Sequence, residues 1–198
     1  MKKIVLATRN SGKIQEIREL FRDLDLEVIP LLDLLAVPEV EEDGSTFREN
    51  ALKKARHVFS YAKLPSIADD SGLEVYSLSL GPGVLSARYA GAGVDYAANN
   101  RKLLEALKKF SPEDRGARFR CVAAFVDSDV EKITEGVCEG TIIMNPRGSG
   151  GFGYDPLFVP KGYDETFAEL SMGVKNQISH RGTAFRIMKQ FLRTHLKL

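Results

Sequence analysis

The sequence lacks the features that would place it in a specialised class of protein. It holds only two cysteines, Cys121 and Cys138, which form no CxxC pair and have no histidine at zinc-binding spacing. Two reduced, buried thiols are typical of a cytoplasmic protein. No stretch approaches the roughly 20 apolar residues of a membrane span, and the apolar run at residues 4–7 is too short for a signal peptide. We therefore expect a soluble, unprocessed, cytoplasmic chain without a membrane partner.

A strong charge of either sign is also missing. The 198 residues carry 28 Lys plus Arg against 27 Asp plus Glu, a formal net charge of +1. Such a chain has no bulk field to attract nucleic acid, so a local cluster must hold any anionic partner. A nucleic-acid repair factor is disfavoured on this ground, and we expect no direct nucleic-acid binding. Because repeats, low-complexity segments and convincing linkers are absent too, we treat residues 1–198 as one domain.

The hydrophobic pattern at the start of the chain predicts a strand, a turn and a helix. Residues 4–7 form a continuous apolar run, as expected of a strand that is buried on both faces. Apolar residues then recur at helical spacing over residues 14–24, and residues 26–30 could form a second strand. Thr46 and Glu49 match a capping box, which predicts that another helix begins there.

Further along the chain, predicted strands cluster. Residues 66–68 are expected to form a short strand that runs into an acidic pair, and residues 73–76 could continue it after a kink. Asp95 can cap a helix. More strands are expected at residues 118–126, 132–143 and 157–159, and a last helix near Ser179. Because strands and helices alternate at first and strands cluster later, we predict an α/β fold with a mixed β-sheet.

The most informative segment is the loop at residues 150–156, with the sequence Gly-Gly-Phe-Gly-Tyr-Asp-Pro. Glycine lets the backbone approach a ligand closely. The ring of Phe152 can stack on a flat heterocycle, and Asp155 can accept hydrogen bonds from its edge. A flexible linker would lack the aromatic rings. The loop therefore indicates a planar ligand, and a structural turn anchored by its rings is the alternative.

A polar turn at residues 8–13 lies between the first predicted strand and helix. Such a turn presents unpaired N–H groups and the positive end of a helix dipole, which favour phosphate. Lys13 adds a full positive charge. Neutral hydrogen-bonding groups come from Thr8, Asn10 and Ser11. The segment is not a Walker A loop, because the first glycine is missing and Ile14 replaces the magnesium-binding Ser or Thr. Capping of the helix by Asn10 or Ser11 is the alternative.

Two acidic segments are candidates for a metal site. Asp69 and Asp70 follow a short strand, and since neighbouring side chains of a strand point to opposite faces, we expect one of them to reach a given site. Carboxylates suit Mg²⁺, which takes one or two protein ligands plus phosphate oxygens, and a nearby carboxylate can deprotonate a water. The second segment is Glu41, Glu42 and Asp43. For either segment alone, a turn with solvated acids is the simpler interpretation.

Hydrogen-bond donors gather just before the last predicted helix. His180 and Arg181 lie there, with Lys175 a short way upstream. Histidine can donate to a carbonyl of a base, and the flat guanidinium suits carbonyl or phosphate oxygens. Surface roles for these side chains, with Ser179 as a cap, are the alternative. Together the four segments supply a phosphate-binding turn, a metal-binding acid, a stacking ring and donors for carbonyls, which are the parts of a nucleoside triphosphate site.

In this order, the segments resemble the inosine triphosphate pyrophosphatase family. The matches cover nearly the whole chain, and an ordered series is far more specific than any single motif. They lie at residues 7–13, 41–51, 68–73, 81–89, 150–156 and 175–182.

The resemblance implies a fold and a reaction. Members of this family hydrolyse inosine, deoxyinosine and xanthosine triphosphates to the monophosphate and pyrophosphate with Mg²⁺, which keeps these nucleotides out of nucleic acid. The implied fold is an elongated mixed β-sheet flanked by helices, with two lobes and a central active-site cleft. A homodimer is implied as well.

The resemblance also assigns roles to individual residues. Triphosphate would be held by Thr8, Arg9, Asn10, Ser11, Gly12 and Lys13. Asp70 would be the general base and a metal ligand, and we favour Glu41 over Glu42 as the second metal acid. Ser71 would touch the substrate. The base would be bound by Phe152, Gly153, Tyr154 and Asp155, and its carbonyls would be recognised by Lys175, His180 and Arg181.

Two other kinds of protein share parts of this pattern. One is a similarly folded pyrophosphatase of modified pyrimidine nucleotides, which Lys175, His180, Arg181 and the Phe152 loop argue against. The other is a nucleotide-binding regulatory module without turnover, in which Asp70 would only hold metal. Substrate turnover separates an enzyme from such a module.

Overall fold

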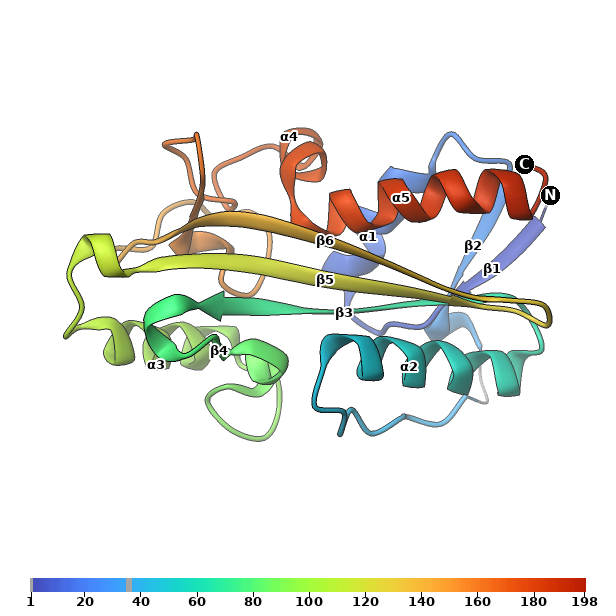
Figure 1. Ribbon diagram of the computed structural model, residues 1–198, viewed down its shortest axis with the longest axis horizontal. Coiled ribbons are helices and arrows are strands. Elements are labelled where there is room, and N and C mark those ends of the chain that lie inside the picture. Colours follow the sequence, from blue (N-terminus) through green and yellow to red (C-terminus); the bar gives the residue numbers. More distant parts are fainter. Residues whose placement is uncertain (1, 35–36) are drawn as a thin grey trace. The chain divides into compact units, whose positions relative to one another are not determined.

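The computed structural model describes residues 2–34 and 37–198. Its strands form one sheet in the order β2-β1-β3-β5-β6-β7, and β4 pairs with β3 (Figure 1). The strands are β1 Lys2–Leu6, β2 Leu26–Pro30, β3 Ser66–Val75, β4 Gly81–Pro82, β5 Gly116–Val126, β6 Glu131–Ile142 and β7 Phe158–Pro160. The α-helices are α1 Ser11–Phe21, α2 Phe47–Ala62, α3 Tyr96–Leu107, α4 Met172–Ile178 and α5 His180–His195. Short 3₁₀ helices lie at Leu31–Asp33, Tyr76–Leu78, Gly83–Arg88, Pro112–Asp114 and Asp155–Leu157.

The sheet is mixed, as predicted. Strand β1 pairs in parallel with β2, where Val5 lies opposite Ile29, and in parallel with β3, where Val5 lies opposite Ser66. The pairings of β3 with β4 and of β6 with β7 are antiparallel. The predicted α/β fold with a mixed sheet flanked by helices is therefore confirmed.

The chain divides into two compact units. Unit 1 comprises residues 1–70, 121–136 and 181–198, and unit 2 comprises residues 71–120 and 137–180. Strands β3, β5 and β6 each contribute residues to both units. The active-site cleft and the treatment of residues 1–198 as one domain stay predictions.

The core of unit 1 forms where α1 and α5 pack on the strands. Ile4 and Leu6 of β1 belong to a buried cluster with Phe125 of β5 and with Phe185 and Met188 of α5. Successive residues of a strand point to opposite faces of the sheet. Val5, between Ile4 and Leu6, is also fully buried, so the opposite face of β1 must be covered as well. Helix α2 contacts β1 and supplies that cover, and Figure 1 shows α2 and α5 on opposite sides of these strands.

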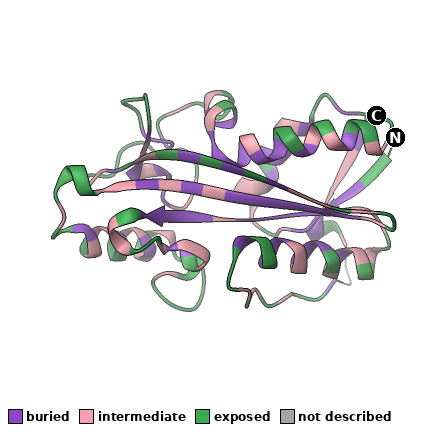
Figure 2. Cartoon of the chain, viewed as in Figure 1, coloured by how far each residue is buried: buried purple, intermediate pink, exposed green. Residues whose placement is uncertain are grey.

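Unit 2 has a core of its own. It contains Leu73 and Val75 of β3, Leu103 of α3, and the rings of Phe119 and Phe158, whose centroids lie 4.8 Å apart. Strand β6 alternates between buried and exposed residues over much of its length, whereas β3 is buried almost throughout (Figure 2). Strand β6 lies near one end of the sheet and has one side facing solvent, whereas β3 is an inner strand covered on both sides, which explains the two patterns.

Two elements differ in extent or number from the prediction. Strand β3 is one strand from Ser66 through Asp69 and Asp70 to Val75, rather than a short strand at residues 66–68 that continues only after a kink. The last helix, α5, begins at His180, as expected near Ser179, but the short helix α4, which ends at Ile178 just before it, was not predicted. By contrast, both reciprocal bonds of the capping box between Thr46 and Glu49 are present at the start of α2.

Candidate functional site

The turn at residues 8–13 lies in unit 1 and caps helix α1. The Asn10 side chain accepts a hydrogen bond from the Lys13 N–H at 3.0 Å, and the Thr8 hydroxyl accepts one from the Asn10 N–H at 3.2 Å. Arg9 is exposed and donates to the Val37 carbonyl at 3.2 Å. The capping interpretation is therefore confirmed. The cap uses the backbone of Lys13, and the Lys13 ammonium pairs with the buried Asp69.

Asp69 is the buried anion that balances the cations of unit 1. Its carboxylate lies 3.0 Å from the Lys13 ammonium and 3.3 Å from the Arg181 guanidinium, which also binds Glu16 at 2.6 Å. Burial alone would raise the pKa of Asp69, but Lys13, Arg181 and Lys54 outweigh it and hold that pKa well below its usual range. Asp69 therefore stays ionised and holds Lys13 in place.

Asp70, the next residue of β3, has separate side-chain partners and is held at both oxygens. Its Oδ1 lies 3.0 Å from the Lys54 ammonium, and its Oδ2 accepts a hydrogen bond from the Asn50 amide at 3.2 Å. Burial and the nearby Glu42 together raise the pKa of Asp70 to about 6, against the opposing attraction of Lys54 and Lys13. A carboxyl with such a pKa is suited to accept a proton near neutral pH.

The structure brings Glu42, rather than the favoured Glu41, to Asp70. The Glu42 carboxylate lies 2.8 Å from the Lys54 ammonium that also binds Asp70, whereas Glu41 is exposed. Although burial opposes the change, Lys54 lowers the pKa of Glu42. An anionic Glu42 beside Asp70 is the arrangement expected of a second acid.

The acids of unit 1 fit a magnesium ion. Glu42 and Asp70 share one ammonium group, so their oxygens already converge on a positive charge. Within residues 2–34 and 37–198, no group of three or more His, Cys, Asp or Glu side chains converges as a metal-ligand set. Since Mg²⁺ commonly takes one or two carboxylates and completes its shell with water and phosphate, a two-acid set suits it.

The glycine-rich loop lies in unit 2 and is closed by Asp155. The Asp155 carboxylate accepts a hydrogen bond from the Phe152 N–H at 2.8 Å and one from the Lys175 ammonium at 2.6 Å. A Cβ atom at Gly151, whose φ is +69°, would lie 2.0 Å from that carboxylate. The loop therefore requires glycine at this position, both for its backbone conformation and for space.

Phe152 is flanked by a cation and by a second ring. The Lys175 ammonium lies 5.1 Å from the centre of the Phe152 ring, and the Tyr96 ring of α3 lies 6.2 Å from it. Next to it, the Asn100 amide of α3 donates to the Gly153 carbonyl at 3.1 Å. Helix α3 thus fastens the loop through two residues that sequence reasoning did not identify.

The remaining predicted residues of unit 2 are mostly buried. The Tyr154 hydroxyl donates to the Ser86 carbonyl at 2.9 Å, and burial raises its pKa. The His180 ring stacks on Phe119 at 4.7 Å with the planes 10° apart. Ser71 is half-buried. A hydrogen bond and a ring contact therefore position Tyr154 and His180 within unit 2.

The structure thus gathers the predicted residues into two sets. Unit 1 holds the turn at residues 8–13, Glu41, Asp70 and Arg181, and unit 2 holds the others, which are Ser71, Phe152, Gly153, Tyr154, Asp155, Lys175 and His180. The prediction missed Asn50 and Lys54. Both are polar residues on the otherwise apolar buried face of α2, four positions apart, and that anomaly could have revealed them.

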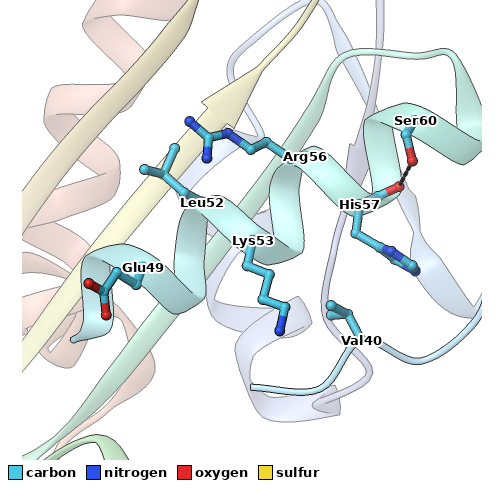
Figure 3. Close-up of a pocket in the computed structure, with 7 residues that line it drawn as sticks. All are labelled: Val40, Glu49, Leu52, Lys53, Arg56, His57 and Ser60. Atoms are coloured by element: carbon cyan, nitrogen blue, oxygen red, sulfur yellow. Dashed lines mark hydrogen bonds between the residues drawn. The ribbon is translucent and has the colours of Figure 1, made fainter. Parts of the chain in front are cut away.

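A shallow hollow on the outer side of α2 is a less suitable site. Figure 3 shows its lining residues, which are Val40, Glu49, Leu52, Lys53, Arg56, His57 and Ser60. Lys53 pairs with Asp43 at 2.5 Å, and Arg56 pairs with Glu131 at 2.6 Å. Because neighbouring acids balance these cations, the hollow offers no excess positive charge to a phosphate.

Taken together, the fold and the two sets define an α/β protein with buried acids beside lysines and an aromatic loop, a pattern typical of nucleotide-handling enzymes. Residues 4–191 match the Ham1 family, and the chain belongs to this family. A dITP/XTP pyrophosphatase of Thioalkalivibrio sulfidiphilus is 49% identical to this chain over 96% of it and 98% of its own length. One of Desulfotalea psychrophila is also 49% identical, over 94% of this chain and 83% of its own length.

Solved structures agree with this family membership. The chain resembles a HAM1 protein of Coxiella burnetii with a TM-score of 0.88 and 46% identity, covering 98% of this chain and 100% of that one. A Ham1 protein of Staphylococcus aureus gives a TM-score of 0.87 at 42% identity, with 98% and 100% covered. In the part of the chain that the structure describes, no helix is long and apolar enough to cross a membrane.

Proposed function

We propose that this chain hydrolyses non-standard purine nucleoside triphosphates, namely inosine, deoxyinosine and xanthosine triphosphates, to the monophosphate and pyrophosphate. The relatives named above as dITP/XTP pyrophosphatases support the substrate class. The observation that carries the reaction is the environment of Asp70, a buried carboxyl with a pKa of about 6 between Lys54 and Asn50. Hydrolysis by such an enzyme keeps these nucleotides out of nucleic acid.

Asp70 acts as the general base in this proposal. It takes the proton of a water whose oxygen bonds to the α-phosphorus, while the bond from that phosphorus to the α–β bridging oxygen breaks and pyrophosphate leaves. Asp70 and Glu42 would hold the Mg²⁺, in place of the initially favoured Glu41, because Glu42 lies beside Asp70. When bound, Mg²⁺ supplies charge neutralisation on the phosphates and lowers the pKa of a bound water.

The triphosphate is assigned to the turn at residues 8–13. Its backbone N–H groups at the start of α1 and the Lys13 ammonium attract negative charge. Asp69 neutralises part of that charge before substrate binds, since it lies 3.0 Å from Lys13. Phosphate oxygens would then compete with Asp69 for the ammonium.

The base is assigned to the loop of unit 2. Phe152 would stack on the purine, with Gly153, Tyr154 and Asp155 beside it, and Ser71 would touch the substrate. Lys175 and His180 would donate to the oxygen at C6 of the purine. Arg181 already binds Asp69 and Glu16, so it would hold Asp69 in place rather than recognise a purine carbonyl.

Selectivity follows from the direction of the hydrogen bonds. Hypoxanthine and xanthine carry an acceptor at C6, whereas adenine carries an amino donor there. Donors of the protein that face another donor remain unsatisfied, at a cost of about 1–3 kcal/mol for each buried group. Two such mismatches correspond to roughly 10²–10⁴-fold discrimination against ATP.

The test is a panel of nucleoside triphosphates assayed with Mg²⁺ for pyrophosphate. Inosine and xanthosine triphosphates should exceed ATP in kcat/KM, and the product should be pyrophosphate rather than orthophosphate. Equal values for ATP would indicate an unselective enzyme, a preference for a modified pyrimidine nucleotide would indicate the related pyrimidine enzymes, and binding without turnover would indicate a regulatory module.

Three further properties belong to the proposal. The chain is expected to form a homodimer, to be cytoplasmic and not to bind nucleic acid directly. The net charge of +1 supports the last of these, because it provides no general attraction to a polyanion. Light scattering, cell fractionation and a binding titration with duplex DNA would test them in turn.

A further inference from the structure

Asn50 is a buried amide whose hydrogen bonds join two acidic parts of unit 1. It lies in the first turns of α2 with 1% of its surface exposed. Its Oδ1 accepts the Gly44 N–H at 2.8 Å, and its Nδ2 donates to the Gly44 carbonyl at 3.4 Å and to Asp70 Oδ2 at 3.2 Å. One side chain therefore links the segment that carries Glu42 to the proposed general base.

The partners of Asn50 fix the orientation of its amide. If the amide were rotated by half a turn, its oxygen would face the Asp70 carboxylate, and its NH₂ group would face the Gly44 N–H. Acceptor would then meet acceptor and donor would meet donor, and none of these bonds would form. An ionised Asp70 carboxylate is consequently met by the NH₂ donor of Asn50.

Gly44 is fitted closely to this amide. A Cβ atom at Gly44 would lie 2.6 Å from Asn50 Oδ1 and 2.9 Å from the Glu49 Cβ, closer than such atoms can approach. A side chain at Gly44 would therefore displace the amide or the segment. The two residues form a clasp, defined here as Gly44 with Asn50.

The clasp differs from Lys54, which provides the second link between the Glu42 segment and Asp70. Lys54 also joins Glu42 to Asp70, but its ammonium is a cation and competes directly with a metal ion for these carboxylates. The Asn50 amide is neutral and binds the opposite oxygen, Oδ2, while Lys54 binds Oδ1. The amide can keep Asp70 oriented without opposing a divalent cation.

We propose that Asn50 is a positioning residue that, through Gly44, sets the placement of Asp70 relative to the acidic segment and thereby the affinity for a divalent cation. This inference rests on the proposed metal site of Asp70 and Glu42. Hydrogen-bonded partners of ligating carboxylates commonly change metal affinity by about 10–100-fold when they are removed. Asn50 does not touch the reacting atoms.

The test is a titration of the nucleotide-free protein with Mn²⁺, in which binding is monitored through the loss of the EPR signal of free Mn²⁺. Asn50→Ala should raise the Kd for Mn²⁺ by about tenfold or more. The matched control is Asn99→Ala in unit 2. Asn99 is 2% exposed, and its amide makes the same kind of bonds, to the Ala90 N–H at 2.7 Å and to the Ser86 and Ala87 carbonyls, with backbone groups in place of a carboxylate. The Kd of Asn99→Ala for Mn²⁺ should stay within about twofold of the wild-type value, even if Asn50→Ala and Asn99→Ala lose similar thermal stability.

A second pair of variants leaves both asparagines intact. Gly44→Ala should weaken Mn²⁺ binding in the same direction, whereas Gly173→Ala, where nothing lies within 4 Å of an added Cβ, should not. An unchanged Kd in either folded clasp variant would overturn the inference, as would a wild-type protein that binds no Mn²⁺. Because no nucleotide is present, these results are independent of the panel that tests the proposed function.

Discussion

The two units prepare their parts of the candidate site by different physical means. In unit 1, acids and bases from separate segments neutralise one another away from water, as Arg181 does with Asp69 and Glu16. In unit 2, the loop is shaped by glycines, by rings and by one ion pair, between Lys175 and Asp155. The buried ion pair of unit 2 joins only two charged side chains, whereas unit 1 couples several buried charges, so a change at one residue of unit 1 alters the others and a change in the loop should stay local.

The largest expected effect tests the charge balance of unit 1. Arg181→Met leaves Asp69 and Glu16 without their shared buried cation, and the loss of one partner of a buried pair destabilises by about 3–5 kcal/mol. Arg193→Met is the control, because Arg193 is half-exposed where it binds Asp23 and should contribute at most about 1 kcal/mol. Urea unfolding of both variants measures the difference, and equal losses would contradict the comparison.

The next effect concerns chemistry rather than stability. Asp70→Asn should reduce kcat for inosine triphosphate by about 10²-fold or more, because the amide cannot accept the proton of water. Glu41→Gln and Glu42→Gln sharpen the assignment of the second acid. The exposed Glu41 should matter less than Glu42, whose carboxylate lies by Lys54. Near-normal turnover of Asp70→Asn would remove Asp70 from the mechanism.

Asp70→Asn should also show a pH-dependent gain in folding stability relative to the wild type. The folded protein holds a proton on Asp70 up to about pH 6, above the ordinary value of 3.8, so the stabilising contribution is complete below pH 3.8 and is lost as the pH rises through 6. Without metal, Asp70→Asn should therefore gain about 2 kcal/mol relative to wild type between pH 4 and pH 7.

A control with the opposite sign is available for that measurement. Lys53 lowers the pKa of the exposed Asp43, so the contribution of the Asp43 carboxylate to folding stability is present above pH 3.8 and is lost as the pH falls. Asp43→Asn should therefore lose stability relative to wild type as the pH rises. Urea unfolding in EDTA measures both variants, and a flat difference curve for Asp70→Asn would contradict the raised pKa.

The smallest effect is expected in the loop of unit 2. Asp155→Asn removes the anion that receives the Phe152 N–H and the Lys175 ammonium, so the stacking ring is less well placed. KM for inosine triphosphate should rise by about tenfold with a smaller change in kcat, since stacking acts on substrate and transition state alike. Asp164→Asn, an exposed change, is the control. A loss of kcat as large as that of Asp70→Asn would contradict the division of tasks between the units.

Local signals explain why much of the fold could be predicted. The apolar run of β1, the capping box of Thr46 and Glu49, and the Asp95 cap of α3 are each encoded within a few residues. Helix α4 has only seven residues, Met172–Ile178, and includes Gly173, so no periodic face announces it. The continuous run of β3 through Asp69 and Asp70, in place of the expected kink, depends on partners that bury these two acids, which local sequence does not reveal.

The residues of the candidate site likewise divide into those that local sequence identifies and those that it does not. The loop at residues 150–156 and the turn at residues 8–13 are contiguous and could be identified directly. The choice between Glu41 and Glu42 could not, because adjacent residues of an irregular segment differ only in where the fold turns their side chains. Here the decisive partner is Lys54, which is brought from α2. Charges that meet across long sequence separations are a property of the tertiary structure.

The interleaving of the units has a consequence for the order of events during synthesis on the ribosome. Unit 1 contains both the first strand and the last helix, and its core joins Ile4 and Leu6 to Phe185 and Met188. All of unit 2 is synthesised before residue 181, so unit 2 can fold while the apolar face of β1 is still uncovered. Since exposed apolar strands favour aggregation, nascent chains stalled before α5 should be the ones that chaperones retain.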